Sequence, residues 1–126
     1  MPTSTKLIAV ADDHPAFRNQ LCTFMRYHGF TVLFDAHSGQ DCIARIEEQM
    51  ILPDLCILDI QMPGLDGFLT AKRIKQAWPQ MRIILYSMKD DDETVARARN
   101  SGADAFVGKA WESHKILNTV NSLLAE

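Results

Sequence analysis

The sequence predicts an α/β fold in three layers, with a doubly wound five-stranded parallel sheet between two layers of helices. Short apolar runs alternate along the chain with longer segments of helical spacing. The run LCIL (55–58) is continuously apolar, which is typical of a strand that helices cover on both faces. Strands that alternate with helices in this way form parallel sheets.

Five apolar runs are predicted to be strands because each is short and is bounded by turn or polar residues. They are KLIAVA (6–11), FTVLFD (30–35), LCIL (55–58), RIILYS (82–87) and AFVG (105–108). In an open parallel sheet, ligands bind at the carboxyl ends of the strands, where the strand order reverses. We therefore expect the functional residues directly after these runs.

A segment of helical character follows each predicted strand. Apolar stripes or Ala-rich helical composition mark 17–25, 43–50, 68–78, 91–102 and 116–124. Ser38 and Asp66 are expected to cap helices, and Met50 is expected on the buried stripe of the second helix. The chain thus reads as five strand–helix units without internal repeats.

Length and composition indicate one globular domain over residues 1–126. The chain is 47% hydrophobic and 23% charged, and its net charge of −3 argues against nucleic-acid binding through this domain alone. The only apolar run near the start meets Asp12 and Asp13 too early for a signal peptide, and no run is long enough to cross a bilayer. We expect no membrane partner.

Three scattered cysteines, Cys22, Cys42 and Cys56, have no CxxC spacing. An odd number within apolar patterns fits reduced thiols in a cytoplasmic protein. The histidines also lack metal-ligand spacing.

Acidic residues follow two of the predicted strands, Asp12 and Asp13 after the first and Asp59 after the third. If these strands are neighbours, about 4.8 Å apart, the carboxylates converge, and two of them at about 5 Å repel by roughly 3 kcal/mol. Such a cluster must take up protons or hold a cation. All-oxygen ligands favour Mg²⁺, which would allow Asp59 to act as a nucleophile toward a phosphoryl group.

Two further polar side chains are expected at the same edge. Ser87 ends the fourth strand and supplies a hydroxyl donor, and Lys109 follows the fifth strand and supplies a positive charge for phosphoryl oxygens.

The segments ADDHP, LDIQMPGLDG, Ser87 and GADAFVGKA together resemble the receiver domain of two-component response regulators, over essentially the whole chain. The segments DDHP and 87–106 are most similar to receivers with a helix-turn-helix output domain (NarL/LuxR-type). The resemblance implies the flavodoxin-like strand order 2-1-3-4-5, the order of a chemotaxis regulator of this family.

The resemblance also implies roles for individual residues. Asp59 would be the phosphoacceptor, with Asp13, Asp59 and the backbone carbonyl of Gln61 on Mg²⁺ and Asp12 reaching it through water. Lys109 and Ser87 would assist catalysis. Ser87 and the strand-five aromatic Phe106 would form the switch.

Partners follow from the same resemblance. A sensor histidine kinase would phosphorylate the chain. Phosphorylation would then change the surface formed by the fourth helix, the fifth strand and the fifth helix, which is the expected surface for a partner or a homodimer. The chain would be a phosphoacceptor regulator and not an enzyme acting on other substrates. It would meet DNA only through an output domain, which these 126 residues lack.

Three positions depart from the family pattern. Ala110 replaces the usual proline after the lysine, and a cis bond at Lys109–Ala110 would cost about 3 kcal/mol, so this loop is expected to be trans or strained. Met88 is bulkier than the common alanine and is expected to shield the site, which would slow phosphorylation by small donors and hydrolysis. Phe106 lacks the hydroxyl of the tyrosine found in some relatives.

Other functions fit the sequence less well. A flavodoxin-like electron carrier needs a Ser/Thr/Gly-rich phosphate loop where this chain has Asp12, Asp13 and His14, and a haloacid-dehalogenase-like phosphatase needs an acid at the position of His14. The open alternatives are a stand-alone receiver that acts by protein–protein interaction and a degenerate receiver that works without phosphorylation.

Overall fold

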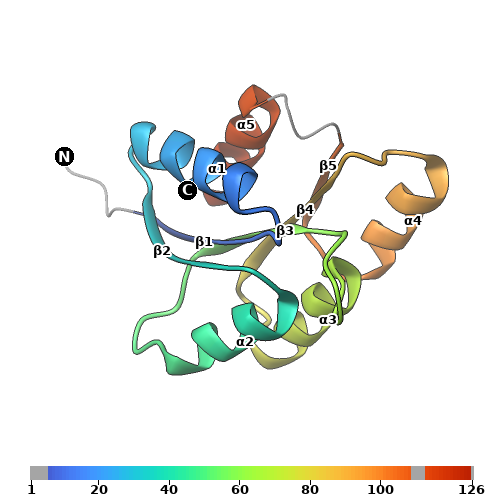
Figure 1. Ribbon diagram of the computed structural model, residues 1–126, viewed down its shortest axis with the longest axis horizontal. Helices are drawn as coiled ribbons and strands as arrows, with labels where there is room; N and C mark the ends of the chain where they lie inside the picture. The colour runs from blue at the N-terminus through green and yellow to red at the C-terminus, as the bar shows by residue number, and fades with distance from the viewer. Residues whose placement is uncertain (1–5, 109–112, 126) are drawn as a thin grey trace.

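The computed structural model describes residues 6–108 and 113–125 (Figure 1). Within this part, one parallel sheet has the order β2-β1-β3-β4-β5. The strands are β1 (Leu7–Ala11), β2 (Thr31–Ala36), β3 (Leu55–Asp59), β4 (Arg82–Ser87) and β5 (Ala105–Gly108). The helices are α1 (Pro15–Tyr27), α2 (Gly39–Glu48), α3 (Gly67–Ala77), α4 (Asp92–Asn100) and α5 (Ser113–Leu124). The predicted fold and strand order are confirmed.

The sheet separates two hydrophobic clusters, as Figure 1 shows by the helices above and below it. Side chains alternate between the two faces of a strand. In β3, Cys56 and Leu58 therefore pack with α2, α3 and α4, whereas Leu55 and Ile57 pack with α1 and α5. Both faces of β3 are fully buried, which explains its continuous apolar run.

The two predicted helix caps are present. The Ser38 Oγ accepts a hydrogen bond from the Asp41 N–H at 3.0 Å, and the Asp66 carboxylate accepts one from the Leu69 N–H at 2.9 Å. The expectation for Met50 was wrong. Helix α2 ends at Glu48, and Met50 lies beyond it with its side chain fully exposed.

All three cysteines are buried free thiols. Cys22 lies in the cluster with α1 and α5, on the other side of the sheet from Cys42 and Cys56. Among the helices of the described residues, none has the length and apolar character that a membrane span needs.

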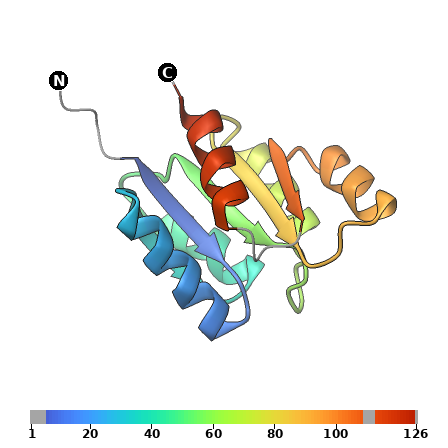
Figure 2. The same cartoon turned by 90° about the horizontal axis from the view of Figure 1, so that it is seen from above.

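The strand arrows in Figure 2 all point to the same edge of the sheet. The connections β1–α1, β3–α3 and β4–α4 leave from this carboxyl edge. The residues that these connections carry are therefore brought together.

Candidate functional site

Strand register brings the acidic residues to one level of the sheet. Ala11 of β1 pairs with Leu58 of β3, so the residues that follow them, Asp12 and Asp59, come next in line on neighbouring strands. Asp59 in turn pairs with Tyr86 of β4. The convergence expected from the sequence thus follows from direct pairing of β1 with β3.

The backbone at Asp59 is held by the start of helix α3. A Cβ on Gly67 would lie 2.5 Å from the Asp59 carbonyl oxygen and 2.7 Å from the Cα of Ile60, so only glycine fits there. The Gly67 N–H also donates to the carbonyl oxygen of Ile60 at 2.9 Å. This close approach fixes the direction in which Asp59 leaves the strand.

The acids line a common cavity of about 260 Å³ at the carboxyl edge. Asp12 is buried, while Asp13 and His14 lie nearer the solvent. The full lining comprises Asp12, Asp13, His14, Phe17, Asp59, Gln61, Tyr86 and Met88. Four predicted site residues, Asp12, Asp13, Asp59 and Gln61, therefore meet in one place.

The cavity disfavours the ionised form of Asp59. Burial raises the pKa of Asp59 from its ordinary value of 3.8 to about 7; the charge of Asp12 is the next largest cause, and that of Asp13 adds to it. The Gln61 N–H, which donates to Asp59 Oδ1 at 3.2 Å, acts in the opposite direction. Among the described residues that line the cavity there is no lysine or arginine to offset these charges.

Sequence reasoning did not find the residues that hold Asp12. The Tyr86 hydroxyl donates to Asp12 Oδ2, and the His14 N–H donates to Asp12 Oδ1 at 2.8 Å. Arg18 donates to the Asp12 carbonyl oxygen at 2.7 Å while it pairs with Asp35 at 2.9 Å. Burial and then the charge of Asp12 raise the pKa of Tyr86 well above its ordinary value of 10, so the phenol keeps its proton and donates.

The donor set fits a hard divalent cation. Asp12, Asp13 and His14 each offer one ligand atom, and these atoms lie within 4.8 Å of one another. The place of His14 in this group was missed because no second histidine stands at ligand spacing. The neighbouring carboxylates oppose the ionisation of Asp59, and a small cation with oxygen ligands would relieve this repulsion.

Ser87 is buried and lies beside a second cavity. Its Oγ accepts the Lys89 N–H at 3.0 Å, at the start of the connection to α4. This second cavity measures about 230 Å³ and is also lined by Gln61, which therefore borders both. Ser87 therefore does not line the acid cavity itself, but a second cavity that shares Gln61 with it, and its hydroxyl is bonded by the β4–α4 connection.

Phe106 lies further along the same side of the sheet. It pairs in register with Leu85 of β4, is half-buried, and packs against the cluster beneath α4. A cavity of about 220 Å³ between α4 and β5 adjoins it and is lined also by Val95, Ala98 and Arg99. The aromatic ring therefore has free volume beside it.

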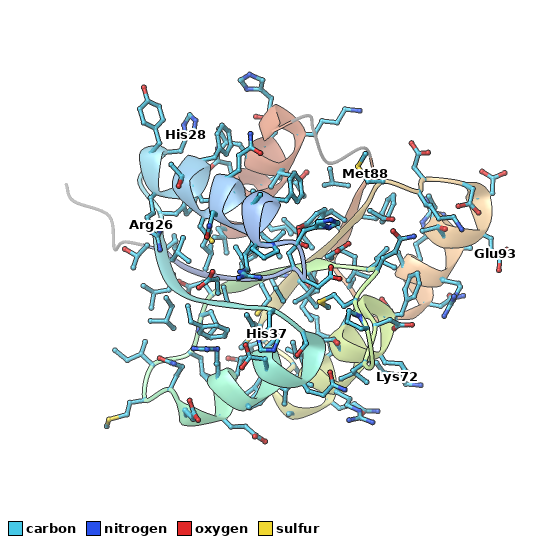
Figure 3. All side chains as sticks on the ribbon, viewed as in Figure 1. Arg26, His28, His37, Lys72, Met88 and Glu93 are labelled. Atoms are coloured by element: carbon cyan, nitrogen blue, oxygen red, sulfur yellow. The ribbon has the colours of Figure 1, made fainter. Side chains whose placement is uncertain are left out.

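Met88 borders the acid cavity and is 55% exposed. Figure 3 labels it at the start of the connection from β4 to α4. Lys109 and Ala110, together with the bond between them, lie outside the described residues.

Comparisons with known proteins identify the family of the chain. Residues 8–121 match the model of the response regulator receiver domain. The chain is 33% identical over 120 residues to the transcriptional activator protein ExaE of Pseudomonas putida, covering 94% of this chain and 55% of the activator. It is 32% identical over 117 residues to the chemotaxis protein CheY of Bacillus subtilis, covering 93% of this chain and 96% of that protein.

A solved structure is similar throughout. The crystal structure of a DNA-binding response regulator of the LuxR family from Staphylococcus aureus superimposes with a TM-score of 0.85 at 26% identity, covering 94% of this chain and 98% of that one. The chain spans about half the length of the activator but nearly all of the chemotaxis protein. The match to the family model covers most of the chain, and the chain therefore belongs to the receiver domain family of response regulators.

Proposed function

We propose that this chain is a phosphorylation-activated switch of two-component signalling, with Asp59 as the phosphoacceptor. The observation that carries the proposal is the cavity in which Asp12, Asp13 and Asp59 meet, with the pKa of Asp59 raised to about 7. Clustered carboxylates are needed to bind a cation that in turn binds an anionic group, whereas a turn with a solely structural role does not need them. The same observation disfavours a degenerate receiver, which has no need of the cluster.

Mg²⁺ is the proposed cofactor, held by Asp13, Asp59 and the backbone carbonyl of Gln61, with Asp12 reaching it through water. When bound, it supplies positive charge that offsets the carboxylates and the phosphoryl oxygens. Asp59 needs this charge because its raised pKa leaves it largely protonated below about pH 7.

The proposed reaction is transfer of a phosphoryl group from a phosphohistidine of a sensor kinase. An Asp59 carboxylate oxygen attacks phosphorus, the new P–O bond forms as the P–N bond breaks, and the released histidine nitrogen keeps the electron pair and takes up a proton from solvent, so that the histidine leaves as neutral imidazole. Lys109 is proposed to stabilise the phosphoryl oxygens. The chain would catalyse only its own phosphorylation and dephosphorylation, and would not act on other substrates.

The signal is proposed to leave the site through Ser87 and Phe106. If Ser87 turns toward a phosphoryl group on Asp59, it must give up the bond from the Lys89 N–H, which changes the β4–α4 connection. Phe106 can then move, since a cavity adjoins its ring. A two-state equilibrium at the face of α4, β5 and α5 would shift, and a second copy or another partner would bind there.

Control of transcription is the proposed output, since similar proteins include a transcriptional activator. We propose that residues 1–126 form a single receiver domain in the cytoplasm. Contact with DNA would come from an output domain outside these residues. The similarity to the chemotaxis protein over 96% of its length favours the alternative, a stand-alone receiver that acts through protein contacts.

The test is incubation with Mg²⁺ and acetyl phosphate, followed by intact-protein mass spectrometry, with oligomeric state measured after addition of beryllium fluoride. We expect a mass gain of one phosphoryl group that requires Mg²⁺ and is absent in Asp59→Asn. Asp54→Asn is the matched control, because Asp54 is an exposed acid near the start of β3 that accepts the Leu7 N–H at 2.8 Å. An unmodified wild type, or equal modification of Asp59→Asn, would contradict the proposal.

A further inference from the structure

Successive residues of β4 serve opposite faces of the sheet. Ser87 belongs to the side of α3 and α4, whereas Tyr86 packs in the cluster with α1 and α5 and is 2% exposed. Tyr86 is the only tyrosine in this cluster among the described residues. A phenylalanine would fill the same apolar space, so packing alone does not explain the hydroxyl.

The hydroxyl has one visible partner, the carboxylate of Asp12. Asp12 is 1% exposed, and its two oxygens are bonded separately, Oδ1 by the His14 N–H at 2.8 Å and Oδ2 by the Tyr86 hydroxyl. A donor on each of the two oxygens restricts the rotation of a carboxylate. Without the phenol, one oxygen of a buried carboxylate would lose its donor, a costly arrangement in a protein interior.

The Tyr86 ring is itself held in place. The Phe17 ring of α1 packs against it, with centroids 5.7 Å apart and an interplanar angle of 53°. Tyr86 also pairs in register with Asp59, so its position is set by the strand that carries the phosphoacceptor. Both rings line the acid cavity together with Asp12.

We propose that Tyr86 is a positioning residue for the cation site: its hydroxyl orients the Asp12 carboxylate and thereby raises the affinity of the cavity for Mg²⁺. This inference rests on the proposed function, because it assumes that the acid cavity binds the cation. Tyr86 acts through Asp12 and touches neither the phosphoryl group nor the cation. Hydrogen-bond partners of metal-binding carboxylates commonly contribute about 10–100-fold to affinity or activity.

The experiment is a double-mutant cycle on Mg²⁺ binding, measured by isothermal titration calorimetry in the absence of any phosphoryl donor. Tyr86→Phe removes only the hydroxyl and is expected to raise the Mg²⁺ dissociation constant roughly tenfold. Tyr27→Phe makes the same chemical change at an exposed residue of α1 and is expected to leave the constant unchanged. Circular dichroism of each variant verifies that the fold is retained.

The second arm of the cycle repeats Tyr86→Phe in an Asp12→Asn background, and Mn²⁺ binding is also measured by electron paramagnetic resonance for all four proteins, so that weaker sites are compared with one readout. If Tyr86 acts through Asp12, the substitution has no effect there. The double variant leaves the Asp12 position without an unpaired charge, so it is expected to fold even if Tyr86→Phe alone does not, and weaker binding by the double variant than by Asp12→Asn would still overturn the role of Tyr86.

The outcomes separate this inference from the proposed function. Failure of the folded wild type to bind Mg²⁺ overturns the proposed function. Binding by the wild type, together with a dissociation constant for Tyr86→Phe within twofold of it, overturns the role of Tyr86 alone. An equal loss with and without the Asp12 carboxylate overturns it as well, because Tyr86 would then act by a different route.

Discussion

The two edges of the sheet carry acids in opposite electrostatic environments. Near the amino edge, Asp104 accepts the Ile83 N–H at 2.8 Å and pairs with Lys75 at 2.9 Å and with Arg82 at 3.4 Å. At the carboxyl edge, Asp12, Asp13 and Asp59 share a cavity that no described lysine or arginine lines. Negative charge at the first edge stabilises the fold, whereas negative charge at the second is left available for a ligand.

The difference implies that the acids at the carboxyl edge lower the stability of the folded chain. Paired acids lower the free energy of the folded state, whereas a clustered acid with a raised pKa, as Asp59 is here, increases it when it ionises. Functional sites commonly carry such a cost. The following changes test whether the two edges differ in this way.

The largest effect is expected for Gly67→Ala. The new Cβ would lie 2.5 Å from the Asp59 carbonyl oxygen, so backbone must move, and we expect a loss of about 3 kcal/mol in the free energy of unfolding, measured by urea denaturation. Gly29→Ala is the comparison, because a Cβ there meets nothing within 4 Å and only the φ of 92° opposes it. That variant should lose about 1 kcal/mol; an equal loss in both would contradict the close packing at Asp59.

Asp104→Asn and Asp59→Asn are expected to change stability in opposite directions. Asp104→Asn removes the charge that pairs with Lys75 and Arg82 and should cost about 2 kcal/mol, with Mg²⁺ affinity unchanged. Asp59→Asn removes a repelled charge and should raise the melting temperature near pH 8 without metal. Thermal unfolding of both variants measures the two signs, and destabilisation by Asp59→Asn would contradict the comparison.

The pH dependence of stability should carry the signature of Asp59. Its pKa is about 7 in the folded chain and near 3.8 when unfolded, so the folded state binds more protons between these values. Stability from this group is therefore present below about pH 4 and is lost as the pH rises through about 7, without metal. Denaturation at a series of pH values should show this slope in wild type and Asp54→Asn but not in Asp59→Asn.

Mg²⁺ provides the internal control for that measurement. It should restore wild-type stability above pH 7, where Asp59 is ionised, and have little effect near pH 4. An identical effect of Mg²⁺ on Asp59→Asn would show that the cation stabilises the chain elsewhere.

The smallest effect is expected for Met88→Ala. Met88 borders the acid cavity, so its removal should admit small donors and water and speed both acetyl phosphate labelling and hydrolysis, each by less than about tenfold. Leu69→Ala serves as a control, because Leu69 is similarly exposed, on α3, and does not line the cavity. Unchanged rates in Met88→Ala would exclude the shielding role.

The sequence was sufficient for the fold because its strongest signals are local. The continuous run at 55–58 and the acids directly after two strands predict which edge holds the site, and parallel register then brings Asp12 and Asp59 together. Asp66 could be recognised as a helix cap because its hydrogen bond joins residues only three apart in the sequence. These features need no knowledge of packing.

The parts that were missed depend on contacts between distant segments. The bond from Tyr86 to Asp12 joins residues 74 apart in sequence, and an apolar run gives no sign that one tyrosine in it will serve an acid on another strand. Met50 fits a helical period, but α2 ends at Glu48 before the period reaches it. Arg18 falls outside the apolar stripe of its helix, as a surface residue would. It nevertheless donates a hydrogen bond to the Asp12 carbonyl oxygen and forms an ion pair with Asp35.

The contact between Gly67 and the end of β3 has a mechanical consequence. Because helix α3 begins directly against the carbonyl of Asp59, with no room there for a side chain on Gly67, the backbone at the end of β3 has little space in which to move. On the neighbouring strand β4, the Ser87 side chain accepts a hydrogen bond from the Lys89 N–H, at the start of the connection to α4. If Asp59 is phosphorylated as proposed, we therefore expect the β4–α4 connection to rearrange and the start of α3 to stay in place.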